Sequence, residues 1–336
     1  MKVAVYSTKS YDKEFLELAN TKGQHELTYF DSTLNERNIR LTEGFNAVCV
    51  FVNDELNAFV IDKLAANGIK VIVLRCAGFN NVDVKRASKW GIKVLRVPAY
   101  SPHAVAEHAV ALIMTLNRKT HKAYNRIREG NFSIERLTGF ELDGKTVGVV
   151  GTGRIGAVFA HIMMGFGCKV IAHDAYLNQS LLDAGVKYFS LEEVFGQSDI
   201  VSLHCPLTPD THHMINEKSI AQMKNGMMLI NTSRGKLIDT EAAIEGLKDG
   251  RIAYLGVDVY EQEESLFFKD LSELIIRDDK ISRLITFPNV LITAHQAYFT
   301  DNALSQISNT TLQNLTDFVA DTIQPQNLVT LEMLKD

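Results

Sequence analysis

The sequence predicts an α/β protein with two doubly wound parallel sheets, each in a domain of its own. Short apolar runs alternate with helical patterns from one end of the chain to the other, which is typical of parallel sheets built from βαβ units. These runs fall into two successive sets, and 336 residues are enough for two ordinary domains with real cores.

The first set predicts a five-stranded sheet with helices between most of its strands, ending near Pro98. We expect strands at Lys2–Ser7, Glu26–Asp31, Ala47–Val52, Lys70–Leu74 and Lys93–Val97, and helices at Asp12–Lys22, Asp54–Asn67 and Val82–Trp90.

The second set begins at Thr146, and a long helix over Pro102–Arg118 connects the two sets. Ser101 can cap this helix, and Pro102 fits its first position. The expected strands of the second set are Thr146–Val150, Lys169–His173, Ile200–Leu203, Met227–Asn231, Tyr254–Asp258 and Val290–Thr293.

A last helix is predicted over Asp301–Ala320, after the final strand. If this helix docks on the first domain, that domain is discontinuous, and the two chain crossings between the domains form a natural hinge. We therefore expect one domain of residues 1–100 plus 300–336 and a second domain of residues 101–299.

Composition and charge exclude several classes of function. The net charge is −5 and the pI about 6.1, which gives no electrostatic argument for a nucleic-acid or membrane partner. No apolar run approaches the roughly 18–20 residues that span a bilayer, and the N-terminal segment turns polar after six residues. We expect a cytoplasmic protein that binds small molecules.

No metal site is expected. The two histidines of the segment His103–His108 are five residues apart, so they do not share a helix face as a zinc pair must. The cysteines form no CxxC pair and are interpreted as buried free thiols; they are Cys49, Cys76, Cys168 and Cys205.

A dinucleotide-binding motif opens the second set. A GxGxxG pattern follows the strand at Thr146 directly and leads into an amphipathic helix over Ile155–Gly165. Gly151 allows the tight turn, Gly153 lets the backbone approach the pyrophosphate, and Gly156 permits close helix–strand packing. Asp174 ends the next strand, where a carboxylate accepts hydrogen bonds from the adenosine ribose and disfavours a 2′-phosphate. The motif predicts an NAD site in a Rossmann-like domain.

Candidate catalytic groups stand at the carboxyl ends of later strands. Hydride transfer to a carbonyl requires a group that orients and polarises the carbonyl and a group that supplies a proton. Arg234 can bind a carboxylate with two parallel hydrogen bonds, and His295 can donate and accept the proton. A carboxylate beside the imidazole would stabilise its protonated form, and periodicity cannot choose between Glu261 and Glu263.

Together these motifs resemble the D-isomer-specific 2-hydroxyacid dehydrogenases over essentially the whole chain. The motifs that carry the resemblance are GTGRIG (151–156), SLHCPLT (202–208), NTSRG (231–235), LGVDVYEQE (255–263), AHQA (294–297), FVND (51–54), RCAGFNNVD (75–83) and VPAYSPHAVAEHA (97–109). The full set is most similar to the bacterial NAD-dependent D-lactate dehydrogenases, although Glu264 stands where relatives with other substrates usually carry proline.

The resemblance implies a reaction and the residues that perform it. It implies two Rossmann-like or flavodoxin-like domains with the active site in the cleft between them. The discontinuous domain would bind substrate, and the other would bind NAD. Arg234, Glu263 and His295 would reduce pyruvate to D-lactate. Substrate would also contact Ala77, Gly78, Tyr100 and Tyr298. The implied cofactor residues are Gly151, Gly153, Arg154, Ile155, Gly156, Asp174, Cys205, Pro206, Thr211, Thr232, Ser233 and Asp258.

Three questions stay open from the sequence. The substrate could be a larger 2-keto acid such as 2-ketoisocaproate, with Phe51, Phe79, Tyr100 and Phe299 as candidate pocket residues. A non-enzymatic NAD(H)-sensing module related to corepressors shares the fold. The family also implies a homodimer or homotetramer with the helix over Pro102–Arg118 at the contact, and the sequence does not choose between the two.

Overall fold

The computed structural model describes residues 1–334, and its contacts divide the chain into two units. The first unit comprises Met1–Ser101 and the segment that begins at Tyr298, and the second comprises Pro102–Ala297. The two α/β units, each with a fully parallel sheet, confirm the predicted fold class.

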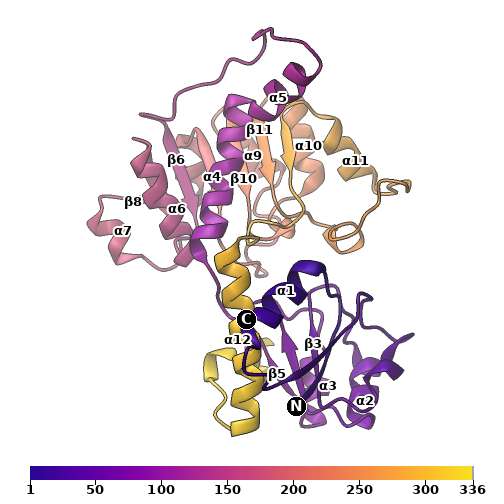
Figure 1. Ribbon diagram of the computed structural model, residues 1–336. Coiled ribbons are helices and arrows are strands. Elements are labelled where there is room, and N and C mark those ends of the chain that lie inside the picture. The colour runs from indigo at the N-terminus through magenta and orange to yellow at the C-terminus, as the bar shows by residue number, and fades with distance from the viewer. Residues whose placement is uncertain (335–336) are drawn as a thin grey trace. The chain divides into compact units, whose positions relative to one another are not determined.

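The first unit is a five-stranded sheet in the order β2-β1-β3-β4-β5 (Figure 1). This is the order of flavodoxin-like folds. The strands are β1 (Lys2–Val5), β2 (Glu26–Tyr29), β3 (Ala47–Val50), β4 (Val71–Leu74) and β5 (Lys93–Leu95); the helices are α1 (Ser10–Ala19), η1 (Ile39–Thr42), α2 (Ala58–Ala66), α3 (Val84–Lys89), α12 (Asp301–Ala320), η4 (Pro325–Asn327) and η5 (Leu331–Leu334).

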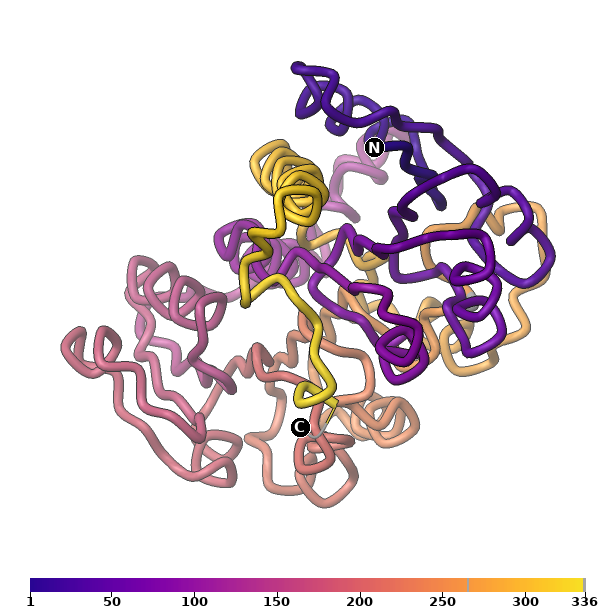
Figure 2. Tube along the Cα trace, turned by 90° about the horizontal axis from the view of Figure 1, so that it is seen from below, coloured from indigo at the N-terminus to yellow at the C-terminus, as the bar shows by residue number. Residues whose placement is uncertain are grey.

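Alternating side chains build a core on each face of this sheet. Val48 and Ile72 belong to the core with α2 and α3, whereas Ala47 and Val71 belong to the core with α1 and α12. Beyond α12, seen nearly along its axis in Figure 2, the chain returns to the sheet edge, where Leu328 forms an antiparallel bridge with Leu95.

The second unit is a seven-stranded sheet in the order β12-β11-β10-β9-β6-β7-β8, which contains the Rossmann order with one added strand. Its strands are β6 (Thr146–Val150), β7 (Lys169–His173), β8 (Lys187–Tyr188), β9 (Ile200–Leu203), β10 (Met227–Asn231), β11 (Ile252–Val257) and β12 (Val290–Ile292). Its helices are α4 (Pro102–Arg118), α5 (Thr120–Arg128), α6 (Arg154–Gly165), α7 (Gln179–Asp183), α8 (Leu191–Gln197), α9 (Glu217–Gln222), η2 (Gly235–Leu237), α10 (Thr240–Lys248), η3 (Glu263–Ser265) and α11 (Asp279–Thr286).

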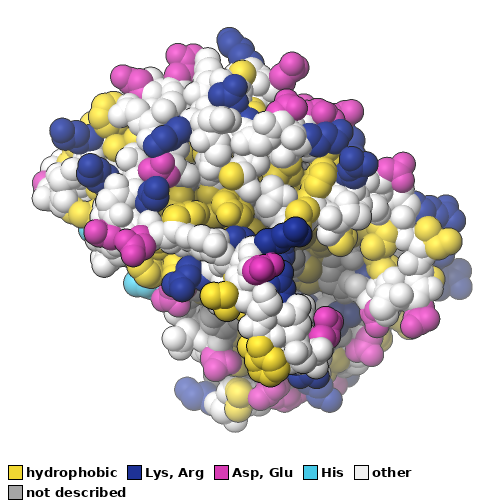
Figure 3. Space-filling model, turned by 90° about the horizontal axis from the view of Figure 1, so that it is seen from above, with side chains coloured by type: hydrophobic (Ala, Val, Ile, Leu, Met, Phe, Trp, Pro, Cys, Tyr) yellow, Lys and Arg dark blue, Asp and Glu magenta, His cyan; other side chains and the backbone are white. Residues whose placement is uncertain are grey.

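Two helical layers cover the second sheet. Side chains of α4 and α6 pack with Val147 and Val149 on one face, and those of α8 to α11 pack with Val201 and Leu203 on the other. In the described part of the chain, no helix has the length and apolarity needed to cross a membrane. Basic and acidic side chains are interspersed over the face shown in Figure 3.

Several element boundaries differ from the prediction for local reasons. The second helix begins at Ala58 rather than Asp54, because Asn57 caps it through the amide of Val60. The buried Asp54 carboxylate instead accepts the amides of Leu34 and Phe51. Strand β8 has two residues, too few for an apolar alternation to reveal it.

Candidate active site

The glycine-rich turn after β6 has the geometry that a dinucleotide requires. Gly151 has a φ of +92°, and a Cβ there would lie 2.5 Å from the amide nitrogen of Cys205. A Cβ on Gly156 would lie 1.9 Å from the carbonyl oxygen of Gly151, so the helix can begin this close to the turn only because residue 156 is glycine. A Cβ on Gly153 would meet nothing within 4 Å, which leaves its backbone accessible to a phosphate.

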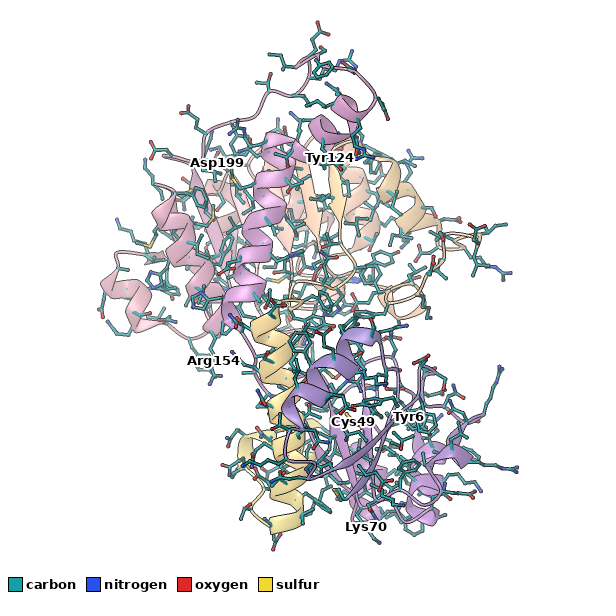
Figure 4. The ribbon with its side chains drawn as sticks, in the orientation of Figure 1. Tyr6, Cys49, Lys70, Tyr124, Arg154 and Asp199 are labelled. Atoms are coloured by element: carbon teal, nitrogen blue, oxygen red, sulfur yellow. The ribbon has the colours of Figure 1, made fainter. Side chains whose placement is uncertain are left out.

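Asp174 lies directly after β7 and faces this turn. Its carboxylate accepts hydrogen bonds from the amide of Thr152 at 2.5 Å, from the Thr152 hydroxyl at 3.1 Å and from the amide of Tyr176 at 3.0 Å. Arg154 lies at the start of α6, and Figure 4 shows its side chain directed away from the sheet. The structure therefore places Asp174 against the glycine-rich turn.

The loops after β9 and β10 complete this edge of the sheet. The hydroxyl of Ser233 donates to the carbonyl of Cys205 at 2.6 Å, and that of Thr211 donates to the carbonyl of Pro206 at 2.7 Å. Burial raises the pKa of the Cys205 thiol to about 11, so the sulfur stays protonated. The buried hydroxyl of Thr232 has no hydrogen-bond partner among the described residues.

The residues at this edge fit NAD. The buried Thr232 hydroxyl, which has no partner among the described residues, suits a ligand that hydrogen-bonds to it, because burying a polar group without a partner is costly. The glycine turn offers room for a pyrophosphate, and Asp174 offers a carboxylate for ribose hydroxyls. Within residues 1–334, no group of three or more His, Cys, Asp or Glu side chains could hold a metal ion.

Arg234 is exposed directly after this edge. One of its terminal nitrogens donates to the carbonyl of Ser233 at 2.7 Å, and its guanidinium forms no ion pair with any described carboxylate. A Cβ on the neighbouring Gly235 would lie 2.1 Å from the carbonyl carbon of Tyr260. The absence of a side chain at Gly235 thus lets the Arg234 loop lie against the segment that leads to Glu263.

The structure brings His295 and Glu263 together. Nδ1 of His295 lies 2.8 Å from Oε1 of Glu263, and Oε2 of Glu263 accepts the amide of Tyr260 at 2.8 Å. Both side chains are about three-quarters buried, with 26% and 24% exposed. Because Nδ1 faces the carboxylate, Nε2 is the nitrogen left to serve a substrate.

The other candidate carboxylate, Glu261, has different partners. Its Oε1 lies 2.7 Å from Nε2 of His213, and its Oε2 accepts the hydroxyl of Thr240 at 2.9 Å. Burial opposes ionisation of Glu261, but the hydrogen bonds from Thr240 and His213 outweigh it and lower the pKa of this carboxyl. Glu261 therefore ties together loops of the second unit, and the pairing with His295 falls to Glu263.

Asp258 anchors the turn that carries His295. Its carboxylate is fully buried and accepts the amides of Gln296 and Ala297 at 2.9 and 2.8 Å, while its carbonyl accepts the amide of His295 at 2.7 Å. Asp258 was predicted only as a cofactor residue. The sequence did not predict that Asp258 stabilises this turn, because these hydrogen bonds join segments far apart in the chain.

The predicted substrate residues of the first unit lie at the carboxyl edge of its sheet. Ala77 and Gly78 follow β4, and within the described residues neither amide donates to a protein acceptor. Tyr298 is 8% exposed, and its ring centroid lies 5.9 Å from that of Tyr100 and 6.4 Å from that of Phe51. Two amides without a protein acceptor can bind a small anion, and the aromatic cluster of the same unit offers apolar surface.

The buried Arg75 at the same edge was not among the predicted site residues. Its guanidinium donates to the carbonyls of Tyr6 and Ser7 at 3.1 and 3.3 Å and lies over the ring of Phe51 at 5.6 Å. Its Nε lies 3.5 Å from the Asp12 carboxylate. Arg75 thus stiffens the loops that end β1 and β3.

Known proteins resemble this chain along its whole length. The family model for the D-isomer specific 2-hydroxyacid dehydrogenase, NAD binding domain, matches residues 110–297. D-lactate dehydrogenase of Escherichia coli (strain K12) is 52% identical over 329 residues, which cover 98% of this chain and 100% of the relative.

Solved structures agree with the sequence relatives. The apo-structure of D-lactate dehydrogenase from Escherichia coli has a TM-score of 0.91 at 50% identity and covers 98% of this chain and 100% of its own. The pyruvate reductase of Chlamydomonas reinhardtii has a TM-score of 0.93 at 45% identity, covering 96% and 97%. A D-2-hydroxyisocaproate dehydrogenase has a TM-score of 0.87 at 34% identity, covering 98% and 100%.

Proposed function

The chain belongs to the D-isomer specific 2-hydroxyacid dehydrogenases, and from this we propose that it reduces pyruvate to D-lactate with NADH. The observation that carries the proposal is the pairing of His295 with Glu263 at 2.8 Å in the unit that also contains the NAD motif. The relatives that share about half of their residues with this chain include D-lactate dehydrogenases and a pyruvate reductase.

In the proposed reaction, Arg234 binds the substrate. One of its terminal nitrogens is engaged by Ser233, and the remaining donors form a fork for the carboxylate and the C2 carbonyl oxygen of pyruvate. Two hydrogen bonds to the substrate orient the carbonyl and polarise it toward the charge that develops on oxygen. The backbone amides of Ala77 and Gly78 are also proposed to bind the substrate carboxylate.

His295 is the proposed acid and base. NADH, when bound, supplies the hydride to C2 of pyruvate. Protonated His295 gives its Nε2 proton to the carbonyl oxygen, so that the C2=O double bond becomes the C–H and O–H bonds of lactate. Glu263, held by the amide of Tyr260, stabilises the imidazolium that this step consumes. In the reverse direction neutral His295 accepts the proton from D-lactate.

Arg234→Lys tests the role of the guanidinium. Lysine keeps the positive charge but loses the two-pronged geometry, so we expect the KM for pyruvate to rise at least about tenfold, as for a lost charge-assisted hydrogen bond. NADH binding, followed by fluorescence titration, should stay near the wild-type value. Wild-type kinetics in this variant would refute the proposed role.

A comparison of substrates tests the proposed specificity. We expect kcat/KM for pyruvate to exceed that for 2-ketoisocaproate, because we propose that the rings of Tyr100 and Tyr298 lie beside the methyl group of the substrate. A preference for 2-ketoisocaproate would assign the chain to the larger keto acids. Binding of NADH with no turnover of either acid would favour the NAD(H)-sensing module instead.

We also propose that the protein acts in the cytoplasm as a homodimer or homotetramer. In support of self-association, four large apolar side chains of residues 124–134 are strongly exposed, with Tyr124 at 61%, Ile127 at 55%, Phe132 at 75% and Ile134 at 82%. Sedimentation analysis should give two or four chains per particle, and a monomer would contradict this part of the proposal.

A further inference from the structure

A buried polar cluster links α4 to the turn that carries His295. His108 lies on α4, and its Nε2 lies 3.0 Å from the hydroxyl of Thr293 and 3.4 Å from Oδ1 of Asp258. The Thr293 hydroxyl lies 2.5 Å from the same carboxylate oxygen. The side chain of Asp258 is fully buried and that of His108 is 17% exposed. We call these three side chains the His108 cluster.

The short contact decides which group donates in the cluster. The Thr293 hydroxyl has one proton, and at 2.5 Å from an ionised carboxylate it must give that proton to Asp258. The Thr293 oxygen can then only accept from His108. Nε2 of His108 therefore carries a hydrogen, and it points toward the threonine and the buried charge.

His108 is also the sole basic side chain within 4 Å of the Asp258 carboxylate among residues 1–334. A buried carboxylate without enough donors is strongly destabilised. The other donors to Asp258 are Thr293 and the amides of Gln296 and Ala297, which belong to the turn around His295. Weakening the cluster would thus loosen the same turn.

The backbone conformation of His295 makes this turn dependent on the hydrogen bonds around it. His295 has a φ of +52°, in the left-handed region that non-glycine residues adopt only at a cost in free energy. The surrounding bonds must supply that energy, and the bonds to Asp258 flank His295 on both sides of the chain. The direction of the imidazole toward Glu263 depends on this backbone conformation.

We propose that His108 is a positioning residue for the reaction: it donates from Nε2 to Thr293 and Asp258, which hold the turn that aims His295. This inference rests on the proposed role of His295 as acid and base. His108 acts through the turn and touches neither the substrate nor the reacting atoms. Its effect should fall on turnover rather than on substrate binding.

The experiment compares His108→Leu, His108→Gln and His103→Leu in the full-length protein. Leucine removes the donor, whereas glutamine can place an amide N–H near the position of Nε2. His103 is the matched control, because it lies on the same helix with 68% of its side chain exposed and lies 4.0 Å from the carboxylate of Glu107. We measure kcat and KM for pyruvate at saturating NADH, NADH affinity by fluorescence titration, and Tm.

His108→Leu should lower kcat about tenfold or more, as expected when a hydrogen bond to a charged group is lost, with KM and NADH affinity within about twofold of wild type. His108→Gln should recover most of kcat, and His103→Leu should match wild type. A kcat within twofold of wild type for His108→Leu would overturn the inference. So would equal losses in the leucine and glutamine variants, or a change confined to KM.

Thr293→Val keeps the inference testable if His108→Leu does not fold. Valine has nearly the same shape but lacks the hydroxyl between His108 and Asp258, so kcat should fall by a similar factor, and an unchanged kcat would overturn the inference. Failure of the proposed function is a separate outcome, because wild-type protein would then show no turnover of pyruvate with NADH.

Discussion

The close packing at Gly235 permits a quantitative prediction. The Cβ of Gly235→Ala would lie 2.1 Å from the carbonyl carbon and 2.2 Å from the carbonyl oxygen of Tyr260. Ordinary contact begins at 3.4 Å, so the Arg234 loop and the Tyr260 segment must separate by about 1.3 Å, the difference between 3.4 and 2.1 Å. The obstacle is backbone, which cannot rotate away as a flexible side chain can. The substitution therefore moves Arg234 relative to Glu263.

A displacement of this size should reduce catalysis strongly. A misplacement of about 1 Å can cost roughly 100-fold in rate, so we expect kcat/KM for pyruvate to fall about 100-fold, which corresponds to about 2.7 kcal/mol of transition-state stabilisation. Initial rates of NADH oxidation measure this quantity. NADH affinity, followed by fluorescence titration, reports separately on the cofactor site, because Thr232 and Ser233 of that predicted site precede Arg234 in the same loop.

Gly165→Ala provides the matched control. Gly165 is the last residue of α6, and a Cβ there would meet no atom within 4 Å. Alanine in a helix is more favourable than glycine by roughly 0.5–1 kcal/mol, so Tm should rise slightly while kinetics stay unchanged. If Gly235→Ala retained wild-type kcat/KM with normal NADH affinity, the reasoning from the close packing would be wrong.

Three further predictions concern single carboxylates. Glu263→Gln should lower kcat for pyruvate reduction about tenfold or more, because the carboxylate that faces Nδ1 of His295 becomes a neutral amide; a kcat equal to that of wild type counts against the pair. Asp174→Ser should raise kcat/KM for NADPH relative to NADH, and an unchanged ratio contradicts the role of that carboxylate. Burial disfavours ionised Asp258, but bonds from His108, Thr293 and two backbone amides prevail and lower its pKa. Its stabilising contribution is therefore present above the ordinary aspartate pKa of about 3.9 and is lost as the pH falls below it, so Asp258→Asn should flatten the acid side of a plot of Tm against pH.

Most of the fold followed from periodicity. The bounds of α4 and α12 match the predicted Pro102–Arg118 and Asp301–Ala320, because both helices carry long apolar stripes with clear first turns. Strand ends were predicted less well, since β1 and β3 stop one or two residues before their apolar runs do. There the chain already turns into loops, with Tyr6 buried and both Phe51 and Val52 half-buried.

Hydrophobic periodicity could not decide whether Glu261 or Glu263 is the partner of His295. Both follow β11 in a segment that is no longer a strand, so alternation says nothing about the direction of either side chain. The family resemblance favoured Glu263, and the structure pairs it with His295 while Glu261 pairs with His213. The roles of these residues in the reaction still await measurement.

No sequence pattern indicated that His108 contacts the turn around His295. A lone histidine on an apolar helix is interpreted as a core residue, and its partners lie more than 140 positions later in the chain. Long-range bonds of this kind become visible only once the fold brings the segments together.

The central claim is tested most directly by incubating the wild-type protein with NADH and pyruvate and analysing the product on a chiral phase. The account predicts stoichiometric oxidation of NADH and formation of D-lactate. L-lactate as the product, or no oxidation of NADH by a protein that binds it, would contradict the account.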